Sequence, residues 1–359
     1  MGRPVFYGPW PQPLGYCRPV PPMQHPPPLE RIDTMSVLKS HWRVALAALV
    51  ICFPHIAFAD GNYPERPITI TTPTAAGGGT DMVARIFAEK ISPLLGQTIV
   101  VNNKPGAGGL IGNQAMQQEK NDGYSLFVSA NNNQLIIPLM LKDANFDPIK
   151  DYEPIAGLAR VPYILAVHPS FPAQNLAEFL SEIKSNPGKY QYVSAGIGTL
   201  NHLVPEILSE RIGSKMEHVP YRGISAALTD VISNRVPIVF GALPAIFPHV
   251  EAGKLRVLAV ASESRLPSLP SVPALNEEVP GMANDMWVAL YAPAKTPDNI
   301  IQKINSAISI AKSDPEVAAR FEQLGMSLMK DGPQELAGRQ EAEFKTWKTV
   351  LRQVGITPQ

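Results

Sequence analysis

Cysteine is nearly absent from this chain of 359 residues: only Cys17 and Cys52 occur, and both precede position 60. A leader peptide ending at Ala59 would remove both of them. The remaining chain would then have no disulfide, no cysteine metal cluster and no cysteine nucleophile.

An excess of positive charge is also lacking. The whole chain is formally neutral, with 31 basic and 31 acidic residues, and residues 60–359 hold 26 basic and 29 acidic side chains. A nucleic-acid-binding surface needs a basic patch or stripe, so we expect no nucleic-acid partner. No apolar run after position 59 approaches the length of a membrane span.

Common catalytic motifs are missing as well. There is no Gly-x-Ser-x-Gly nucleophile elbow and no His-Glu-x-x-His zinc motif. Gly106-x-Gly108 matches part of a dinucleotide fingerprint, but the remaining spacing is poor. We therefore expect neither an enzyme nor a cofactor or metal. A secreted hydrolase whose carboxylate pair forms only in three dimensions stays open as a less favoured alternative.

The segment Met35–Ala59 has the pattern of a secretory signal peptide. A short basic stretch around Lys39 and Arg43 precedes an apolar core, and Ala57-Phe58-Ala59 gives the small-x-small cleavage pattern. Residues 35–59 are thus predicted to be a signal peptide cleaved after Ala59, which places the mature protein in the periplasm. Residues 1–34 are rich in proline and are predicted to be a non-native extension from a wrongly chosen start codon; a disordered extension is the alternative.

The most informative feature after the leader is a glycine loop between a strand and a helix. The β-rich run Ile68–Thr72 is followed by Gly77, Gly78 and Gly79, and then by Thr80 and Asp81 at the start of an amphipathic helix. Glycine lets a backbone approach a ligand closely, and Thr80 or Asp81 suits a helix N-cap. Free amides and the helix dipole favour an anion at such a place. A tight turn that binds nothing is the alternative.

Four further polar loops follow a predicted strand or precede a predicted helix. They are Gly106–Gly109, the polar turn Ser129–Gln134 with Asn131, the glycine turn Gly196–Thr199 followed by His202, and Tyr221–Gly223 with Arg222. One such loop is weak evidence, but five at strand ends in both halves of the chain favour a binding function.

Strand and helix patterns alternate through the rest of the chain, which predicts an α/β fold with helix-covered open sheets. Ligands in such sheets bind beyond the carboxyl ends of the strands. The predicted strands are Ile68–Thr72, Ile99–Asn102, Ser125–Ser129, Tyr163–Val167, Tyr190–Ser194, Ile238–Phe240, Arg256–Ala261 and Val288–Ala292. The predicted helices are Asp81–Leu95, Leu110–Gln118, Asn175–Ser185, Leu203–Arg211, Ser225–Ser233, Pro297–Lys312, Pro315–Leu324 and Pro333–Val354.

Several short motifs, taken in order, carry a family resemblance that runs from Tyr63 to the C-terminus. They are Tyr63-Pro64-Glu65-Arg66-Pro67-Ile68, Gly78-Gly79-Thr80-Asp81, Asn103-Lys104-Pro105-Gly106-Ala107-Gly108-Gly109, Asp122-Gly123-Tyr124, Asp151-Tyr152-Glu153-Pro154-Ile155, Ala252-Gly253-Lys254-Leu255-Arg256 and Leu269-Pro270-Ser271-Val272-Pro273. In these motifs the chain resembles the substrate-binding receptors of tripartite tricarboxylate transporters, also called the Bug family.

The resemblance implies a two-domain periplasmic-binding-protein (Venus flytrap) fold of the α/β class with two interdomain crossings. Domain 1 would comprise residues 60–163 and 285–359, and domain 2 residues 164–284. Such a receptor is a monomer that binds a small organic acid through backbone amides and passes it to the membrane subunits of the transporter. Gly241-Ala242 departs from the Asp-Asn of many members, so a side-chain contact is expected to be missing there. A receptor of an ATP-driven importer is the second alternative.

These arguments together give one predicted ligand-binding site. Its residues are Gly77, Gly78, Gly79, Thr80, Asp81, Gly106, Gly108, Asn131, Gly196, Gly198, Thr199, His202, Tyr221 and Arg222. Two of them have a plain structural alternative. A histidine in a first helical turn is more often structural than a ligand contact, and Arg222 could pair with a surface carboxylate.

Overall fold

The computed structural model describes residues 63–353, which belong to one compact unit. The predicted extension (1–34) and signal peptide (35–59) lie outside the described residues. Strands and helices alternate along the described chain, so the α/β class predicted from the sequence is confirmed.

The strands are β1 (Ile68–Thr72), β2 (Ile99–Asn103), β3 (Ser125–Ala130), β4 (Tyr152–Val161), β5 (Tyr163–Val167), β6 (Gln191–Ser194), β7 (Glu217–Pro220), β8 (Ile238–Ala242), β9 (Arg256–Val260), β10 (Met286–Pro293) and β11 (Ser327–Leu328). The α-helices are α2 (Gly79–Leu95), α3 (Leu110–Met116), α4 (Ile137–Met140), α5 (Leu176–Ser185), α6 (Leu200–Ile212), α7 (Ile224–Ile232), α8 (Leu243–Glu251), α9 (Leu275–Glu278), α10 (Asp298–Lys312), α11 (Pro315–Gln323) and α12 (Pro333–Gln353). A short 3₁₀ turn, η1 (Ala107–Gly109), precedes α3, and a π-helical turn, η2 (Asn132–Ile136), precedes α4.

The strands form two mixed sheets. The first has the order β11-β4-β10-β3-β1-β2, and the second has the order β7-β6-β8-β5-β9. Within the first sheet β1 is parallel to β2 and β3, and within the second β6 is parallel to β7 and β8. Each of these parallel strands leads into a helical segment, so the helix starts of each sheet gather at the carboxyl edge of its parallel strands.

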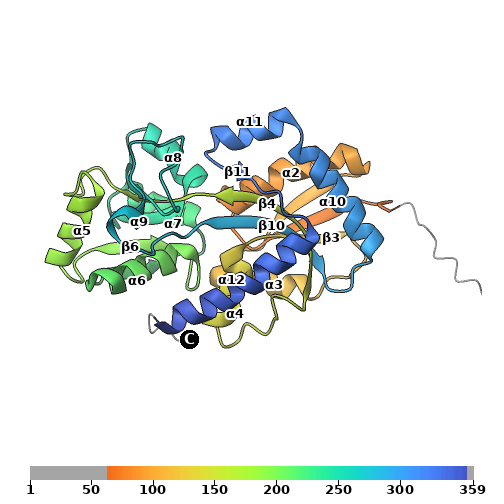
Figure 1. The fold of residues 1–359 in the computed structure, drawn as a ribbon, viewed down its shortest axis with the longest axis horizontal. Coiled ribbons are helices and arrows are strands. Elements are labelled where there is room, and N and C mark those ends of the chain that lie inside the picture. Colours follow the sequence, from red (N-terminus) through yellow and green to blue (C-terminus); the bar gives the residue numbers. More distant parts are fainter. Residues whose placement is uncertain (1–62, 354–359) are drawn as a thin grey trace, which may run out of the picture. The chain divides into compact units, whose positions relative to one another are not determined.

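The chain passes between the two sheets twice. It leaves the six-stranded sheet after Val161 and enters the five-stranded sheet at Tyr163, and it returns at Met286. Val161 and Met286 are direct partners in the antiparallel pairing of β4 with β10, so the two crossings lie side by side (Figure 1). The fold therefore has two crossings, as the family resemblance implies.

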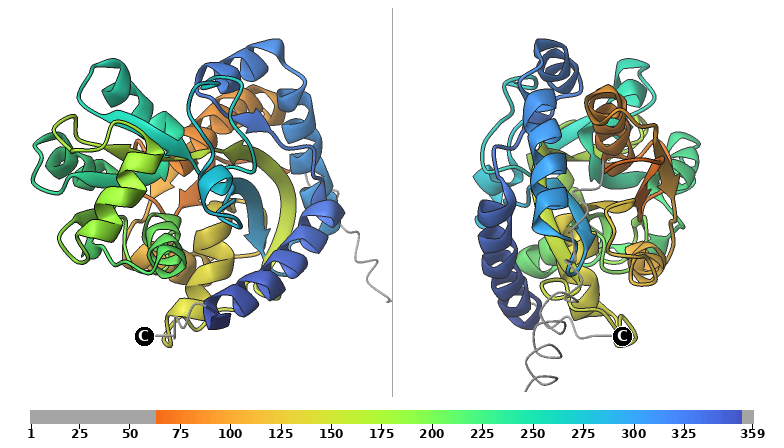
Figure 2. Two further views of the ribbon diagram at one scale, coloured as in Figure 1. Left: turned by 60° about the vertical axis from the view of Figure 1, so that its left-hand side comes forward. Right: turned by 90° about the vertical axis from the view of Figure 1, so that its right-hand side faces the viewer.

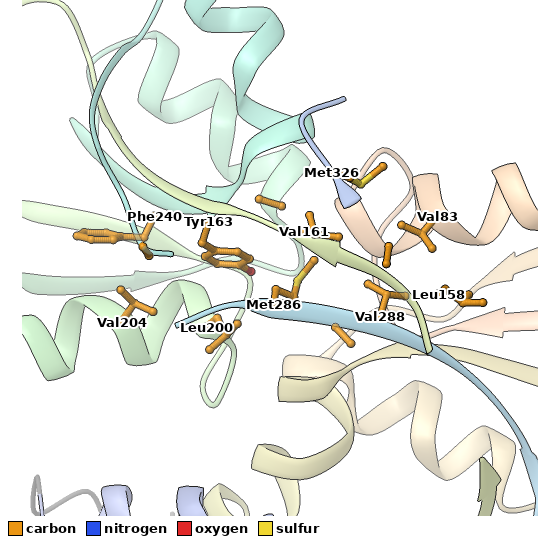
Figure 3. Close-up of a cluster of buried hydrophobic side chains, with 14 of the residues drawn as sticks. Val83, Leu158, Val161, Tyr163, Leu200, Val204, Phe240, Met286, Val288 and Met326 are labelled. Atoms are coloured by element: carbon orange, nitrogen blue, oxygen red, sulfur yellow. The ribbon is translucent and has the colours of Figure 1, made fainter. Parts of the chain in front are cut away.

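The apolar core continues through the crossings. Figure 3 shows Val161, Tyr163 and Met286 between side chains of the six-stranded sheet, such as Val288, and side chains of the five-stranded sheet, such as Phe240. Each such side chain contributes about 1.5–3 kcal/mol when it is fully buried. The two sheets therefore share a packed core at the place where the chain connects them.

The C-terminal helix α12 packs on the six-stranded sheet. Helix α12 packs against β4, and Figure 2 shows it (dark blue) running beside that strand. Trp287 of β10 donates a hydrogen bond to Oε2 of Glu343 on α12 (2.5 Å). Trp287 and Tyr291 of β10 are both buried in the core.

Some local predictions were wrong. Helix α2 begins at Gly79 with Gly78 as its N-cap, not at Asp81, because Gly78 has the extended backbone of a cap and Thr80 already lies in the first turn. Helix α6 begins at Leu200 rather than Leu203. The segment expected to be a polar turn around Asn131 is the end of β3 followed by η2.

Candidate ligand-binding site

A cavity of about 60 Å³ lies where the helix starts of the two sheets meet. The residues that line it come from loops after β1, β2 and β3 of the first sheet, from loops after β6, β7 and β8 of the second, and from the crossings. They are Pro73, Thr74, Ala75, Gly78, Gly79, Thr80, Gly106, Gly108, Gly109, Asn132, Asn133, Tyr163, Ala195, Thr199, Asn201, Arg222, Gly223, Ile224, Ala242 and Met286.

The start of α2 forms one part of the wall, and Asp81 holds its loop in place from behind. The Asp81 carboxylate accepts hydrogen bonds from the Gly77 amide (2.9 Å), from Arg85 Nε (3.0 Å) and from Asn103 Nδ2 (2.8 Å). Burial alone would raise the pKa of Asp81, but the hydrogen bonds from Arg85, Gly77 and Asn103 outweigh it and lower the pKa. Asp81 is thus a charged anchor of the loop, and it does not line the cavity.

A network of side-chain amides holds the second glycine loop. Asn133 Nδ2 donates to the Gly108 carbonyl (2.5 Å), and Asn113 Nδ2 donates to the Gly109 carbonyl (3.1 Å). The hydroxyl of Tyr152 donates to Asn113 Oδ1 (2.8 Å). These bonds hold the loop carbonyls in place, and the Gly109 amide donates to the Gly106 carbonyl (2.9 Å).

The third loop rests on a pair of histidines. The Thr199 hydroxyl donates to the Gly196 carbonyl (2.6 Å), and the Gly198 amide donates to Nδ1 of His202 (3.3 Å). The ring of His202 lies 4.3 Å from that of His218, centroid to centroid. Burial lowers the pKa of both histidines to about 4, and for His218 the charge of His202 adds to this effect. His202 therefore supports the loop as a neutral acceptor.

Arg222 and Gly223 complete the wall from the second sheet. Gly223 is the N-cap of α7, and Arg222 directly precedes it. Tyr221 points its hydroxyl away to Asp230 Oδ2 (2.6 Å). Arg222 lines the cavity and forms no ion pair with any acidic side chain among residues 63–353, so the sequence-based alternative of a surface ion pair does not apply.

The two walls touch each other around the cavity. The hydroxyl of Ser225 donates to the carbonyl of Ala76 (3.0 Å). A Cβ added to Gly223 would lie 2.7 Å from the Cβ of Ala75, and one added to Gly108 would lie 2.4 Å from the carbonyl oxygen of Ile197. These contacts join the β1–α2 and β2–α3 loops to the loops of the second sheet. The arrangement is a closed one.

Several backbone amides in the lining have no partner. The amides of Gly79, Thr80, Asn201 and Ile224 belong to the first turns of α2, α6 and α7, where no intrahelical acceptor exists. Within the described part of the chain, no other protein acceptor is within hydrogen-bonding distance of them. All four residues are buried, and an unpartnered buried N–H group costs about 1–3 kcal/mol. The cavity thus presents a set of donors that an anion would satisfy.

The structure brings together half of the site residues named from the sequence. Those that line the cavity are Gly78, Gly79, Thr80, Gly106, Gly108, Thr199 and Arg222. Those outside the lining are Gly77, Asp81, Asn131, Gly196, Gly198, His202 and Tyr221. Most of the second group support the loops from behind, whereas Asn131 donates to Glu343 Oε1 (2.6 Å) on α12.

Sequence reasoning did not name the other lining residues, and Tyr163, Asn201 and Met286 are among them. Tyr163 and Met286 lie at the two crossings, and Asn201 Nδ2 donates to the Phe240 carbonyl (2.6 Å) at the end of β8. Ala242 lines the cavity with a methyl group.

Residues 63–353 contain no cluster of three or more His, Cys, Asp or Glu side chains that could hold a metal ion. No helix in the same range is long and apolar enough to cross a membrane.

Comparisons with known proteins agree with this architecture. Residues 83–356 match the tripartite tricarboxylate transporter family receptor. Protein BugT of Bordetella pertussis is 31% identical over 296 residues, which cover 82% of this chain and 91% of BugT. The structure of R. palustris Rpa4515 with adipate superimposes with a TM-score of 0.80 at 30% identity and covers 83% of this chain and 100% of that one. MatC from Rhodopseudomonas palustris with bound malate gives a TM-score of 0.77 at 29% identity, covering 80% of this chain and 100% of MatC.

The fold class and the family expected from the sequence are both confirmed by these matches. The similar structures include a periplasmic transporter and the periplasmic binding protein BugD. The chain therefore belongs to the tripartite tricarboxylate transporter family of receptors, whose members are periplasmic solute-binding proteins.

Proposed function

We propose that this protein captures a small organic acid in the periplasm, holds its carboxylate with backbone amides in the cavity between the two sheets, and delivers it to the membrane subunits of a tripartite transporter. The observation that carries the proposal is the set of unpartnered amides of Gly79, Thr80, Asn201 and Ile224 in one lining. A carboxylate has oxygen lone pairs enough to accept from several of them at once.

The helix starts around the cavity strengthen this argument. The N-caps of α2, α6, α7 and α8 all line it, and none of the four forms a side-chain capping bond. By contrast, α5 and α11, whose N-caps lie outside the lining, are capped by the side chains of Asn175 and Asp314. Uncapped first turns direct both free N–H groups and the positive ends of the helix dipoles toward the cavity. An anion is the ligand that such a field stabilises.

Two relatives support a carboxylate as the ligand. The neighbours with adipate and with malate share the fold over 80% or more of this chain. Both named ligands carry carboxylates. No set of catalytic side chains lines the cavity in the described chain, so we propose binding without turnover.

We further propose that the two sheets mark the two domains, with residues 60–163 and 285–359 in domain 1 and residues 164–284 in domain 2. A ligand that contacts both walls would favour closure about the paired crossings at Val161 and Met286. Closure would let the membrane subunits distinguish a loaded receptor from an empty one.

We also propose how the protein is exported, in which oligomeric state it acts and which type of transporter it serves. The protein would be exported by the signal peptide 35–59, cleaved after Ala59, and act as a monomer. A receptor of an ATP-driven importer is the alternative. Neighbouring genes for a large and a small multi-span membrane protein would favour the tripartite system, and a gene for an ATPase would favour the importer.

The direct test is calorimetry of the mature protein against a panel of organic acids. We expect at least one acid to bind and none to be chemically altered. Binding by none of them, or turnover of a chromogenic ester or glycoside, would contradict the proposal.

A pair of glycine variants tests whether the closed loops form the site. Gly108 and Gly213 have the same φ of +65°, so alanine strains the backbone equally at both positions. At Gly108 the new Cβ would lie 2.4 Å from the Ile197 carbonyl oxygen, whereas at Gly213 nothing lies within 4 Å. We expect Gly108→Ala to weaken binding by at least tenfold and Gly213→Ala to leave it unchanged. Equal affinities in the two folded variants would remove this loop from the site.

A further inference from the structure

The carboxylate of Glu343 on α12 joins three parts of the chain. Its Oε2 accepts a hydrogen bond from Trp287 Nε1 of β10 (2.5 Å). Its Oε1 accepts from Asn131 Nδ2 (2.6 Å), between β3 and η2, and from Trp347 Nε1 of α12 itself (3.1 Å). Hydrogen bonds to an ionised acceptor are stronger than those between neutral groups. Glu343 therefore ties α12 both to β10 and to the junction between β3 and η2.

Glu343 lies on the other face of the second crossing from the cavity. Successive side chains of a strand point to opposite faces. Strand β10 begins with Met286, which lines the cavity, and continues with Trp287. Asp285, Trp287 and Glu343 line a groove of about 430 Å³ instead. Because Glu343 does not reach the cavity, any effect that it has on binding must pass through its partners.

Asn131 connects Glu343 to the cavity wall. Its Nδ2 also donates to the carbonyl of Asp285 (3.2 Å), so the same side chain holds the second crossing. The next two residues, Asn132 and Asn133, line the cavity, and Asn133 donates to a carbonyl of the second glycine loop. A shift of Asn131 would therefore displace the lining turn η2 and, with it, the loop that η2 holds.

The layer between α12 and η2 contains polar groups that weaken the fold. Asn131 Oδ1, both polar atoms of the Gln134 side chain and Gln340 Nε2 are buried, and none has a hydrogen-bond partner among residues 63–353. Gln134 lies in η2, and Gln340 lies one turn before Glu343 on α12, which packs against η2. Apolar side chains would fill such a layer without leaving buried polar atoms unpaired. This polar layer therefore favours a role beyond stability.

We propose that Glu343 is a positioning residue of the binding site: through Asn131 it fixes the turn η2 against the second crossing, in the arrangement that receives the organic acid. This role rests on the proposed function, since it assumes that an acid binds in the cavity. It makes the C-terminal helix part of the binding machinery, although no residue of α12 (Pro333–Gln353) lines the cavity.

Calorimetry of single variants tests the role of Glu343. The mature wild type is titrated with malate, adipate, succinate, citrate, glutamate and benzoate, and the variants with the tightest binder among these six. We expect Glu343→Ala to weaken binding at least tenfold, because η2 loses its anchor. Glu343→Gln should lose less, since one side-chain oxygen still accepts a hydrogen bond. The matched control is Glu341→Ala at an exposed position of the same helix, which should bind like the wild type.

A double-mutant cycle tests the route through Asn131. Asn131→Ala should weaken binding by a factor similar to that of Glu343→Ala, and the double variant should bind no more weakly than the weaker single variant, because both substitutions remove the same link. Trp347→Phe removes only the hydrogen bond within α12 and should leave the affinity unchanged. Melting temperatures above the assay temperature would show that the variants are folded. If Glu343→Ala does not fold, Glu343→Gln takes its place in the cycle.

Tryptophan emission reports on the same link. Two of the four tryptophans precede Ala59, so the mature protein would contain Trp287 and Trp347, and both donate to Glu343. A coupling between two places acts in both directions. Saturation with the acid should therefore change the emission of the mature wild type, and Asn131→Ala should reduce that change.

The outcomes separate the two proposals. If none of the six acids binds, the proposed function is wrong and the positioning role falls with it. If an acid binds and folded Glu343→Ala binds it as tightly as Glu341→Ala does, the receptor function stands and the role of Glu343 is wrong. If the losses of affinity multiply in the double variant, or if the emission changes equally in the wild type and Asn131→Ala, the proposed route through Asn131 is wrong.

Discussion

The histidine pair behind the Gly196–Thr199 loop predicts how the stability of this receptor depends on pH. Burial lowers the pKa of His202 from 6.5 to about 4. In the unfolded chain the same side chain would titrate near 6.5. Between these values the unfolded state binds a proton that the folded state does not, so the free energy of unfolding falls as the pH decreases. The loss begins near pH 7 and levels off below about pH 4.

The magnitude follows from the size of the shift. A shift of about 2.5 pKa units corresponds to a maximum of about 3 kcal/mol, and between pH 8 and pH 5 the loss from His202 alone is about 2 kcal/mol. The pKa of His218 is also lowered to about 4, but His218 adds a smaller amount because it is partly exposed. Carboxylates with lowered pKa values, such as Asp81, change the free energy of unfolding mostly at lower pH. Histidine titration therefore dominates the window between pH 5 and pH 7.

The assay is urea unfolding of the mature protein at pH 8, 7, 6 and 5. His202→Asn removes the titration but keeps an oxygen that can accept from the Gly198 amide, which now donates to Nδ1 of His202 (3.3 Å). Between pH 8 and pH 5 we expect the free energy of unfolding of this variant to fall by about 2 kcal/mol less than that of the wild type. The control is His168→Asn at a surface histidine beside Ser170, which should follow the wild-type curve. Parallel curves for wild type and His202→Asn would refute the reasoning.

Three further predictions concern closure and stability. Small-angle scattering should show a smaller radius of gyration with a bound acid than without it; an equally extended bound state would mean that one wall alone holds the ligand. Ser225→Ala removes the hydrogen bond from Ser225 to the Ala76 carbonyl. Loss of one hydrogen bond costs about 1 kcal/mol, so binding measured by calorimetry should weaken about fivefold. Its melting temperature should change little. Phe321→Ala removes a buried ring that packs edge-on against Phe87 at 5.8 Å, so it should cost about 3–5 kcal/mol in urea unfolding and leave the ligand affinity of the folded protein unchanged.

The fold was predictable because buried strands and amphipathic helices leave strong local patterns. The strand Ile68–Thr72 has the predicted bounds, and the helix predicted from Pro315 ends within one residue of its observed end. Helix α8 was missed because Pro244 and Pro248 suggest a loop. Pro244 lies in the first turn of α8, where a backbone N–H would have no intrahelical acceptor, so its absence in proline costs no helical hydrogen bond.

The site was predictable only where it consists of loops. Glycine-rich turns after strands mark places where a backbone can approach a ligand, and Gly78, Gly108 and Thr199 were found in this way. Tyr163 and Met286 could not be found, because they lie in ordinary apolar strands. Their place in the lining depends on the meeting of two sheets that are far apart in the sequence.

The caps of the helices contain a signal that sequence reasoning did not use. A helix start that only needs to be stable gains from a side-chain acceptor, and Asn175 and Asp314 provide one. A helix start that binds an anion must keep its amides free, and Gly78 and Gly223 have no side chain with which to occupy them. Thr199 has a hydroxyl, but it donates to the Gly196 carbonyl and so does not compete for the amides. A glycine at the N-cap of a helix that follows a parallel strand is therefore better evidence for an anion site than the serine, threonine or aspartate that capping preferences favour.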